Sequence, residues 1–353
     1  MQIVHPMIKE SQVLEALSRV QDPELGKDLV SLNMIKDISI IDDSVQFTLV
    51  LTTPACPLRN QLESDARAAV QAIPGVKKIE IKVDSRVPRP TNKPEMLDLS
   101  IKHIIAVGSG KGGVGKSTVA VNLAVALAQS GAHVGLLDAD IYGPNIPKMM
   151  GITALPPQQG QKLVPAEAYG VKVMSTGFLV QKDQPLIWRG PLLHSIIKQF
   201  LSDVIWGDLD YLIIDLPPGT GDVQLSLSQV ISLSGGIIVT MPQQVSLDDA
   251  SRALVMLKKL GIPVLGVIEN MGYLILPDGS QMSIFGTGGG KMLAESNCVP
   301  FLGTIEIYPS IREGGDNGRP IMVSEPLSQP SLDFRRIAGE IAAQLSIETL
   351  KKQ

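Results

Sequence analysis

The sequence predicts two structural classes in succession: a small α+β domain, then an α/β domain with a mostly parallel sheet and helices on both faces. Short apolar runs alternate with helical segments from residue 101 onward, as in parallel strands joined by crossover helices. The first 85 residues show a different order, with a hairpin between two helices. Hydrophobic residues make up 44% of the chain and aromatic residues 4%, which suits strands buried on both faces by aliphatic side chains.

The length, charge and cysteine content of the chain disfavour some classes of function and partner. The chain has 353 residues, enough for about two domains. Its 31 Lys and Arg against 35 Asp and Glu give a net charge of −4, and no run of five like charges occurs. We therefore expect no nucleic-acid partner and no membrane partner. Two cysteines cannot form a disulfide framework and the N-terminus shows no leader pattern, so a cytoplasmic location is expected.

The expected first domain covers residues 1–86. Apolar residues recur at helical spacing over 9–20, and Asp22-Pro23-Glu24 ends that helix. Alternating apolar residues on both sides of Asp42-Asp43-Ser44 predict a β-hairpin. The domain therefore begins with a helix followed by two paired strands.

A second helix and a third strand complete this domain. Pro57 is expected to start the helix, Pro74-Gly75 to stop it, and 76–83 to form the strand. The Pro-rich stretch 87–100 then predicts a semi-extended linker. The second domain is accordingly expected over residues 101–353.

Seven candidate strands alternate with helices in this second domain. They are 103–108, 133–137, 171–175, 211–214, 236–240, 263–268 and 299–303. Apolar residues between Leu332 and Leu345 predict a C-terminal helix. We expect this helix to dock on the core; an amphipathic membrane anchor is the alternative, which its sparse basic residues disfavour.

A glycine-rich segment links the first of these strands to a helix. Residues 110–117, GKGGVGKS, fit G-x-x-x-x-G-K-[ST] and predict a P-loop NTPase fold. The glycines let backbone N–H groups point inward, and the following helix N-terminus favours anions. Lys116 is expected on the β- and γ-phosphates, and the Ser117 hydroxyl on Mg²⁺. The expected nucleotide-binding residues are Gly110, Lys111, Gly112, Gly113, Val114, Gly115, Lys116, Ser117 and Thr118.

Two aspartate motifs follow predicted strands. Asp138 and Asp140 come at the end of 133–137, and Asp215 comes directly after 211–214. The carboxyl ends of strands in open α/β sheets carry the ligand crevice, so we expect these residues beside the phosphate loop. Asp215 suits Mg²⁺ binding, directly or through water, and Asp140 suits orientation of the attacking water. The alternative is that each aspartate only caps the segment after it.

The loop and several longer motifs resemble a known family. Lys111 directly after the first glycine resembles the deviant Walker A motif of the MinD/ParA/nitrogenase-iron-protein class. Further segments are similar to the Mrp/ApbC branch of that class: 137–147, 188–191, 215–222, 269–271, 284–286 and 312–316. Asp22-Pro23-Glu24 and 52–58 are similar to a small iron-sulfur-assembly-type domain often fused to this family.

The resemblance implies an ATP-dependent iron-sulfur cluster carrier. Its cofactors would be ATP, Mg²⁺ and a [4Fe-4S] cluster, and its partners apoprotein clients and assembly factors. In that class the extra lysine reaches the nucleotide of the partner subunit, so Lys111 implies a homodimer. Lys111, Lys116 and Asp140 would serve slow ATP hydrolysis coupled to cluster transfer, and Asn270 would contact the adenine base.

One motif of this family is missing. Members usually carry Cys-x-x-Cys shortly after Glu-Asn-Met, but Leu276 and Gly279 stand there, and neither ligates iron. Cys56 then becomes the candidate iron-sulfur ligand, because Pro57 places it at an expected helix N-cap that would stabilise its thiolate. A small buried hydrophobic role is the alternative for Cys56, and Cys298 has a weaker context.

Two other functions compete with cluster carriage. A MinD/ParA-like spatial-organising ATPase would bind membrane or DNA, which the acidic charge balance disfavours. A metal-free ATP-dependent assembly scaffold would use the same fold and is favoured by the missing Cys-x-x-Cys. Iron content separates this scaffold from a carrier.

Overall fold

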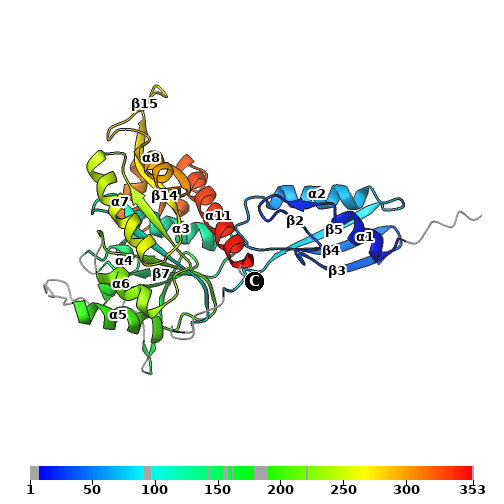
Figure 1. Cartoon of the computed structure of the whole chain (residues 1–353), viewed down its shortest axis with the longest axis horizontal. Coiled ribbons are helices and arrows are strands. Elements are labelled where there is room, and N and C mark those ends of the chain that lie inside the picture. Colours follow the sequence, from blue (N-terminus) through cyan, green and yellow to red (C-terminus); the bar gives the residue numbers. More distant parts are fainter. Residues whose placement is uncertain are drawn as a thin grey trace, which may run out of the picture. The chain divides into compact units, whose positions relative to one another are not determined.

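The computed structural model describes residues 8–90, 97, 99–140, 143–153, 158–160, 162–178, 190–219 and 222–351 (Figure 1). Contacts divide the chain into two compact units, Met1–Pro88 with Ala342–Gln353, and Arg89–Ile341. This division groups residues 342–353, which belong to the expected second domain, with the first unit. Residues 91–96 and 98 of the expected linker lie outside the described part.

The first unit contains a three-stranded sheet with two helices. The sheet order is β3-β4-β5, antiparallel between β3 and β4 and parallel between β4 and β5. Two short strands, β1 and β2, pair with each other. The elements are α1 (Glu10–Leu17), β1 (Gln21–Asp22), β2 (Lys27–Asp28), β3 (Ile35–Ile41), β4 (Ser44–Leu51), α2 (Arg59–Gln71) and β5 (Lys78–Ser85).

One apolar cluster holds this unit together. Val13 and Leu17 of α1 pack with Leu62 of α2 and with Phe47 and Leu49 of β4, and all five side chains are fully buried. The predicted helices and hairpin are therefore confirmed, although α1 ends at Leu17, earlier than expected. Burial of these aliphatic and aromatic side chains supplies the main driving force for folding the unit.

The second unit is built on a nine-stranded sheet. Its order is β10-β11-β7-β12-β6-β13-β14-β15, and β16 also pairs with β14. The strands are β6 (Ile101–Ser109), β7 (Val134–Asp138), β10 (Ala166–Ala168), β11 (Val171–Ser175), β12 (Leu209–Asp215), β13 (Gly235–Thr240), β14 (Val264–Ile275), β15 (Gln281–Met282) and β16 (Phe301–Ile307). All seven predicted strands are present and join through parallel pairings, so the predicted α/β class is confirmed.

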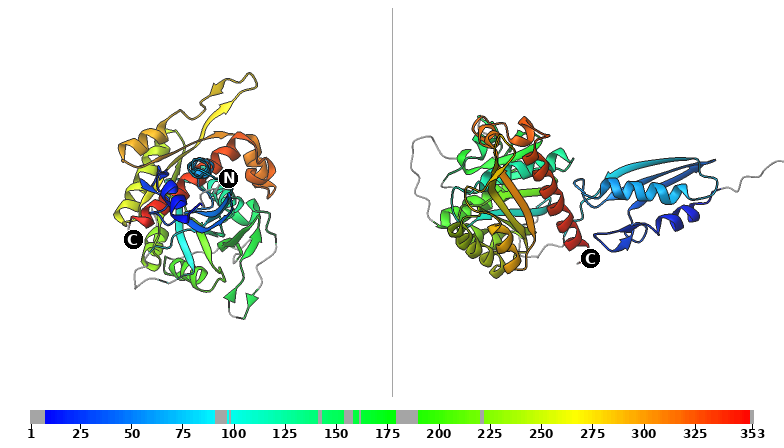
Figure 2. Two further views of the ribbon diagram at one scale, coloured as in Figure 1. Left: turned by 90° about the vertical axis from the view of Figure 1, so that its right-hand side faces the viewer. Right: turned by 90° about the horizontal axis from the view of Figure 1, so that it is seen from above.

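Helices cover both faces of this sheet (Figure 2). Leu212 and Ile214 of β12 pack with Ile197 and Phe200 of α5 on one face. Side chains alternate along a strand, so Ile213 points to the other face, where α3 contacts β12. The helices are α3 (Lys116–Gln129), α4 (Ile146–Met149), α5 (Gly190–Ser202), α6 (Asp222–Val230), α7 (Gln244–Lys259), α8 (Gly289–Ser296), α9 (Pro309–Asp316), α10 (Ile321–Ser324) and α11 (Gln329–Leu350).

The register of three central strands positions the site. Asp215 at the end of β12 pairs with Val107 of β6 on one side and with Asp138 of β7 on the other. Ser175 at the end of β11 pairs with Asp138 in turn. The loop after β6 and the last residues of β7, β11 and β12 therefore meet at one edge of the sheet.

Several short elements were not predicted. β10 and β15 add antiparallel pairings at the ends of the sheet, β8 (Gln158–Gln159) pairs with β9 (Lys162–Leu163), and Thr176–Phe178 forms a 3-10 turn. The hairpin of β14 and β15 projects from the rest of the unit (Figures 1 and 2).

The C-terminal helix is confirmed as α11. Phe334, Ile337, Ile341 and Leu345 are at most 2% exposed and Leu332 is 46% exposed, so most of the apolar residues that predicted the helix are already buried in the protein. This burial favours the docked helix over the amphipathic anchor. Among the described residues, no helix is both long and apolar enough to cross a membrane.

Candidate nucleotide-binding site

The phosphate loop depends on glycine at two positions. Gly110 lies against the backbone of α7 at Asp249 and Ala250, and a Cβ there would overlap both. Gly115 caps α3 with φ +83°, a left-handed conformation that favours glycine, and a Cβ would also overlap the amide of Asn270. These constraints fix the path of the loop from β6 into α3.

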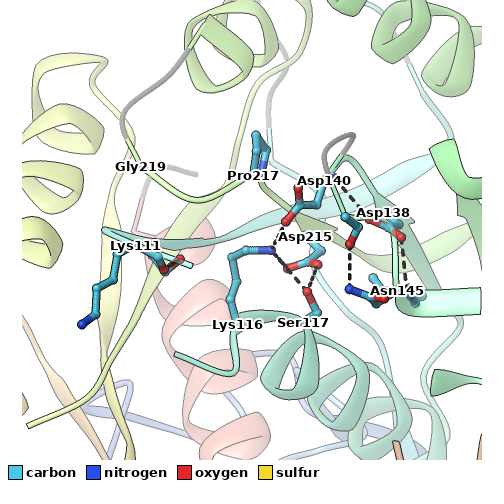
Figure 3. A network of polar contacts seen from close by, with 12 residues as sticks. Lys111, Lys116, Ser117, Asp138, Asp140, Asn145, Asp215, Pro217 and Gly219 are labelled. Atoms are coloured by element: carbon cyan, nitrogen blue, oxygen red, sulfur yellow. Dashed lines mark hydrogen bonds and ion pairs between the residues drawn. The ribbon is translucent and has the colours of Figure 1, made fainter. Parts of the chain in front are cut away.

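Lys116, Ser117 and Asp215 form a compact polar group at the base of the loop (Figure 3). The Lys116 Nζ lies 2.7 Å from Asp215 Oδ1, and the Ser117 hydroxyl donates to Asp215 Oδ2 at 2.5 Å. Lys116 is 6% exposed and Asp215 is fully buried. Burial raises the pKa of Asp215, and the Lys116 charge opposes that rise.

Asp140 faces the same lysine. Its Oδ2 lies 3.4 Å from Lys116 Nζ. Its other oxygen, Oδ1, is buried and has no hydrogen-bond partner among the described residues. A buried carboxylate oxygen without a donor is costly, so this atom is available to accept a hydrogen bond from a bound molecule.

Asp138 lies behind Asp140 and is fully buried. Its carboxylate accepts hydrogen bonds from the Asp140 backbone at 3.1 Å, the Ser175 hydroxyl at 2.8 Å and the Ile146 backbone at 3.3 Å. Burial, together with the charge of Asp215, raises the pKa of Asp138 to about 8.

Lys116, Ser117 and Asp140 line a cavity of about 570 Å³. Its volume is in the range of small-molecule sites. Residues that line it come from the phosphate loop, α4, β14, the end of β16 and α9. They include Gly112, Gly113, Gly115, Lys116, Ser117, Thr118, Asp140, Lys148, Pro218, Asn270, Tyr308, Ile311, Arg312 and Asp316.

Asn270 joins the phosphate loop to β14. Its amide donates to the Val114 carbonyl at 2.9 Å, and its side chain is 5% exposed. The residue lines the cavity, as the expected contact with a base requires, and in this structure its amide holds the loop.

Lys111 also lines the cavity but does not join the Lys116 group. Its Nζ lies 3.2 Å from Gln243 Oε1, at the N-terminal end of α7. Figure 3 shows its side chain directed away from Lys116. The two lysines of the loop therefore contact different parts of the protein.

The expectation for Cys56 was wrong in its local structure. Leu58 is the N-cap of α2, so Cys56 precedes the helix by more than one residue. Pro57 and Leu58 continue a turn in which the Arg59 N–H donates to the Cys56 carbonyl. Burial raises the pKa of the Cys56 thiol to about 11, opposite to the expected effect of a helix dipole.

Other sequence-predicted features are not among the residues that line the cavity, or are outside the described residues. Cys298 is exposed and Cys56 half-buried, and no group of three His, Cys, Asp or Glu side chains in the described part could hold a metal ion. Residues 141–142 and 220–221, and 188–189 of the 188–191 motif, lie outside the described residues. Leu276 and Gly279, in place of Cys-x-x-Cys, lie in the turn between β14 and β15.

Two residues of this site were given no role from the sequence. Asp138 was noted only as part of a motif, and Ser175 only as the end of a predicted strand. Both are polar residues at the carboxyl ends of buried parallel strands, the same signal that pointed to Asp215.

Comparisons with known proteins agree with this geometry. The NUBPL iron-transfer P-loop NTPase family matches residues 100–342, and the iron-sulfur cluster assembly protein family matches residues 10–83. A Synechocystis protein named iron-sulfur cluster carrier protein is 52% identical over 352 residues, covering 98% of this chain and all of that protein. An Escherichia coli protein of the same name is 40% identical over 346 residues, covering 96% and 93%.

A solved structure shares the fold of the second unit. The nucleotide-binding protein of Archaeoglobus fulgidus, in complex with ADP, is 39% identical with a TM-score of 0.54 and covers 62% of this chain and 88% of its own. The family match alone spans more than half of the sequence. The chain therefore belongs to the NUBPL iron-transfer P-loop NTPase family.

Proposed function

We propose that this protein is an ATP-binding and hydrolysing iron-sulfur cluster carrier. The observation that carries the proposal is that the phosphate loop, Lys116, Ser117 and Asp140 line one cavity, while the buried Asp215 bonds to Lys116 and Ser117. Relatives that match nearly the whole chain bear the name iron-sulfur cluster carrier protein, which supports an iron-sulfur cluster as the cargo.

The residues present fit a magnesium-nucleotide complex. The Ser117 hydroxyl and the Asp215 carboxylate lie 2.5 Å apart and are the oxygen donors that Mg²⁺ prefers. When bound, Mg²⁺ supplies charge neutralisation at the β- and γ-phosphate oxygens. Lys116 lies between two carboxylates and is expected to move its ammonium group onto the phosphates when ATP enters.

The proposed chemistry is hydrolysis by in-line attack of water. Asp140 Oδ1 accepts a hydrogen bond from the attacking water, which orients it toward the γ-phosphorus. A new P–O bond forms to water while the bond to the β-phosphate oxygen breaks, giving ADP and phosphate. Lys116 and the loop N–H groups hold the negative charge that develops.

We further propose that the active form is a homodimer. Lys111 belongs to the phosphate loop, but its ammonium group is directed away from the site toward Gln243. A second copy facing this loop would meet that ammonium group, and Lys111 would exchange its hydrogen bond to Gln243 for the nucleotide of the partner. Apoproteins that accept the cluster, and assembly factors that supply it, are the other proposed partners.

The test is anaerobic iron-sulfur reconstitution of the wild type, Cys56→Ser and Cys298→Ser. Iron and sulfide are then quantified beside ATP hydrolysis. We expect the wild type to bind iron and sulfide and to hydrolyse ATP. Loss of iron in Cys56→Ser but not in Cys298→Ser would identify Cys56 as a ligand. A wild type that hydrolyses ATP but stays free of iron would replace the carrier by a metal-free assembly scaffold, the function favoured by Leu276 and Gly279.

A further inference from the structure

The end of β7 holds a buried carboxylate that does not line the cavity. Asp138 is fully buried and is absent from the residues that line the cavity. Unlike Asp215, it makes no hydrogen bond to Lys116 or Ser117 among the described contacts, so it is placed to act on the site through its own neighbours. Those neighbours are the donors of three hydrogen bonds, which come from different segments of the second unit.

Each hydrogen bond of Asp138 fixes one of these segments. Its Oδ1 accepts from the Asp140 N–H at 3.1 Å. Its Oδ2 accepts from the Ile146 N–H, where α4 begins, and from the Ser175 hydroxyl at the end of β11. The Ser175 hydroxyl oxygen in turn accepts from the Gly177 N–H at 2.9 Å, which ties down the 3-10 turn after β11.

The Asp138 hydrogen bond holds the backbone of Asp140. The Asp140 carboxylate itself has one polar partner among the described residues. Its Oδ2 lies 3.4 Å from Lys116 Nζ, while its Oδ1 has no partner. Lys116 is also the residue expected to move when ATP binds, so that restraint weakens at the moment of reaction. The hydrogen bond from the Asp140 backbone to Asp138 does not involve the nucleotide and stays in place.

We propose that Asp138 is a positioning residue for hydrolysis: it fixes the backbone of Asp140 so that the free Asp140 oxygen meets the attacking water. This inference rests on the proposed function and adds to it a residue that does not touch ATP. Ser175 supports the same arrangement by orienting the Asp138 carboxylate. Misplacement of a reacting group by about 1 Å costs about 100-fold in rate, so loss of the restraint is measurable.

The experiment compares Asp138→Ala, which removes both accepting oxygens, with Ser175→Ala, Asp140→Asn and the double variant Asp138→Ala/Asp140→Asn. Steady-state ATP hydrolysis gives kcat and KM for each, and thermal unfolding checks that each is folded. Ser331→Ala is the matched control, because Ser331 is an equally buried serine of the second unit that hydrogen-bonds to Ile321 and Glu325. Ser175→Ala keeps the test informative if Asp138→Ala does not fold.

We expect kcat to fall about 10- to 100-fold in Asp138→Ala and several-fold in Ser175→Ala, with KM for ATP within twofold of wild type. Asp138→Ala should add no further loss in the Asp140→Asn background, because it acts through that residue. Unchanged kcat in both Asp138→Ala and Ser175→Ala, or losses that multiply in the double variant, would overturn the inference while leaving the proposed function intact. Absence of hydrolysis by the wild type would overturn both.

Discussion

At the scale of single residues, the site is dominated by charges that have been removed from water. Lys116 is the one cation close to Asp140 and Asp215 in the described part, and it is nearly fully buried. A buried carboxylate that loses its partner keeps its desolvation cost without compensation. Removal of Lys116 should therefore affect both catalysis and stability.

We expect Lys116→Ala to lower ATP hydrolysis by at least about 100-fold and the free energy of unfolding by about 3 kcal/mol at pH 8. Hydrolysis assays and urea unfolding measure these two effects. Lys102→Ala is the control, since Lys102 forms a comparable 2.7 Å pair with Asp210 but is more exposed. An equal loss of stability in the two variants would contradict the assigned burial of the Lys116 pair.

The Cys56 thiol gives a prediction about pH. Its raised pKa, about 11, means that the folded protein disfavours the thiolate. The neutral Cys56 thiol therefore contributes to the free energy of unfolding below the ordinary cysteine pKa of about 8.5, and this contribution is lost as the pH rises toward 11. Alkylation of Cys56 in a Cys298→Ser background should accelerate about tenfold per pH unit from 8 to 10, and a rate that levels off near pH 8 would refute this.

At the scale of elements, the sequence predicts the regular parts well and the short pairings poorly. The seven parallel strands carry long aliphatic runs, and each is found. β8, β9 and β15 have only two residues each and exist because a neighbouring segment pairs with them, which no local pattern reveals. The start of α2 was missed because Pro57 suits a turn as well as a first helical position.

The same contrast holds for the candidate site. The phosphate loop and Asp215 follow from motif and strand position alone. The Asp138 network does not, because it depends on the register that brings Ser175 beside β7. The direction of Lys111 toward α7 likewise depends on tertiary packing between segments far apart in the chain.

Two glycines of the phosphate loop provide a matched pair. Gly113 and Gly115 both have φ near +80°, but a Cβ meets nothing within 4 Å at Gly113 and overlaps Asn270 at Gly115. Gly113→Ala should cost about 1 kcal/mol of unfolding free energy from backbone strain. Gly115→Ala should cost about 1–3 kcal/mol more from overpacking, measured by urea unfolding, and equal costs would argue against the Asn270 contact.

At the scale of the whole molecule, the homodimer proposal rests on Lys111. With Mg²⁺ and a non-hydrolysable ATP analogue, the wild type should sediment as a dimer and Lys111→Ala as a monomer that still binds nucleotide. Lys258→Ala is the control, because Lys258 is an exposed lysine whose Nζ bonds to the Asn297 carbonyl instead. A Lys111→Ala protein that dimerises as well as the wild type would exclude this role for the second lysine.

We propose that this one chain couples ATP to iron-sulfur cluster carriage. The most direct measurement is the rate of cluster transfer from the reconstituted protein to an apo-acceptor, with and without ATP, for the wild type and Lys116→Ala. We predict that ATP changes the wild-type transfer rate severalfold and leaves the Lys116→Ala rate unchanged at equal iron content. A wild type that transfers no cluster, or transfers it at one rate whether or not ATP is present, would contradict the account.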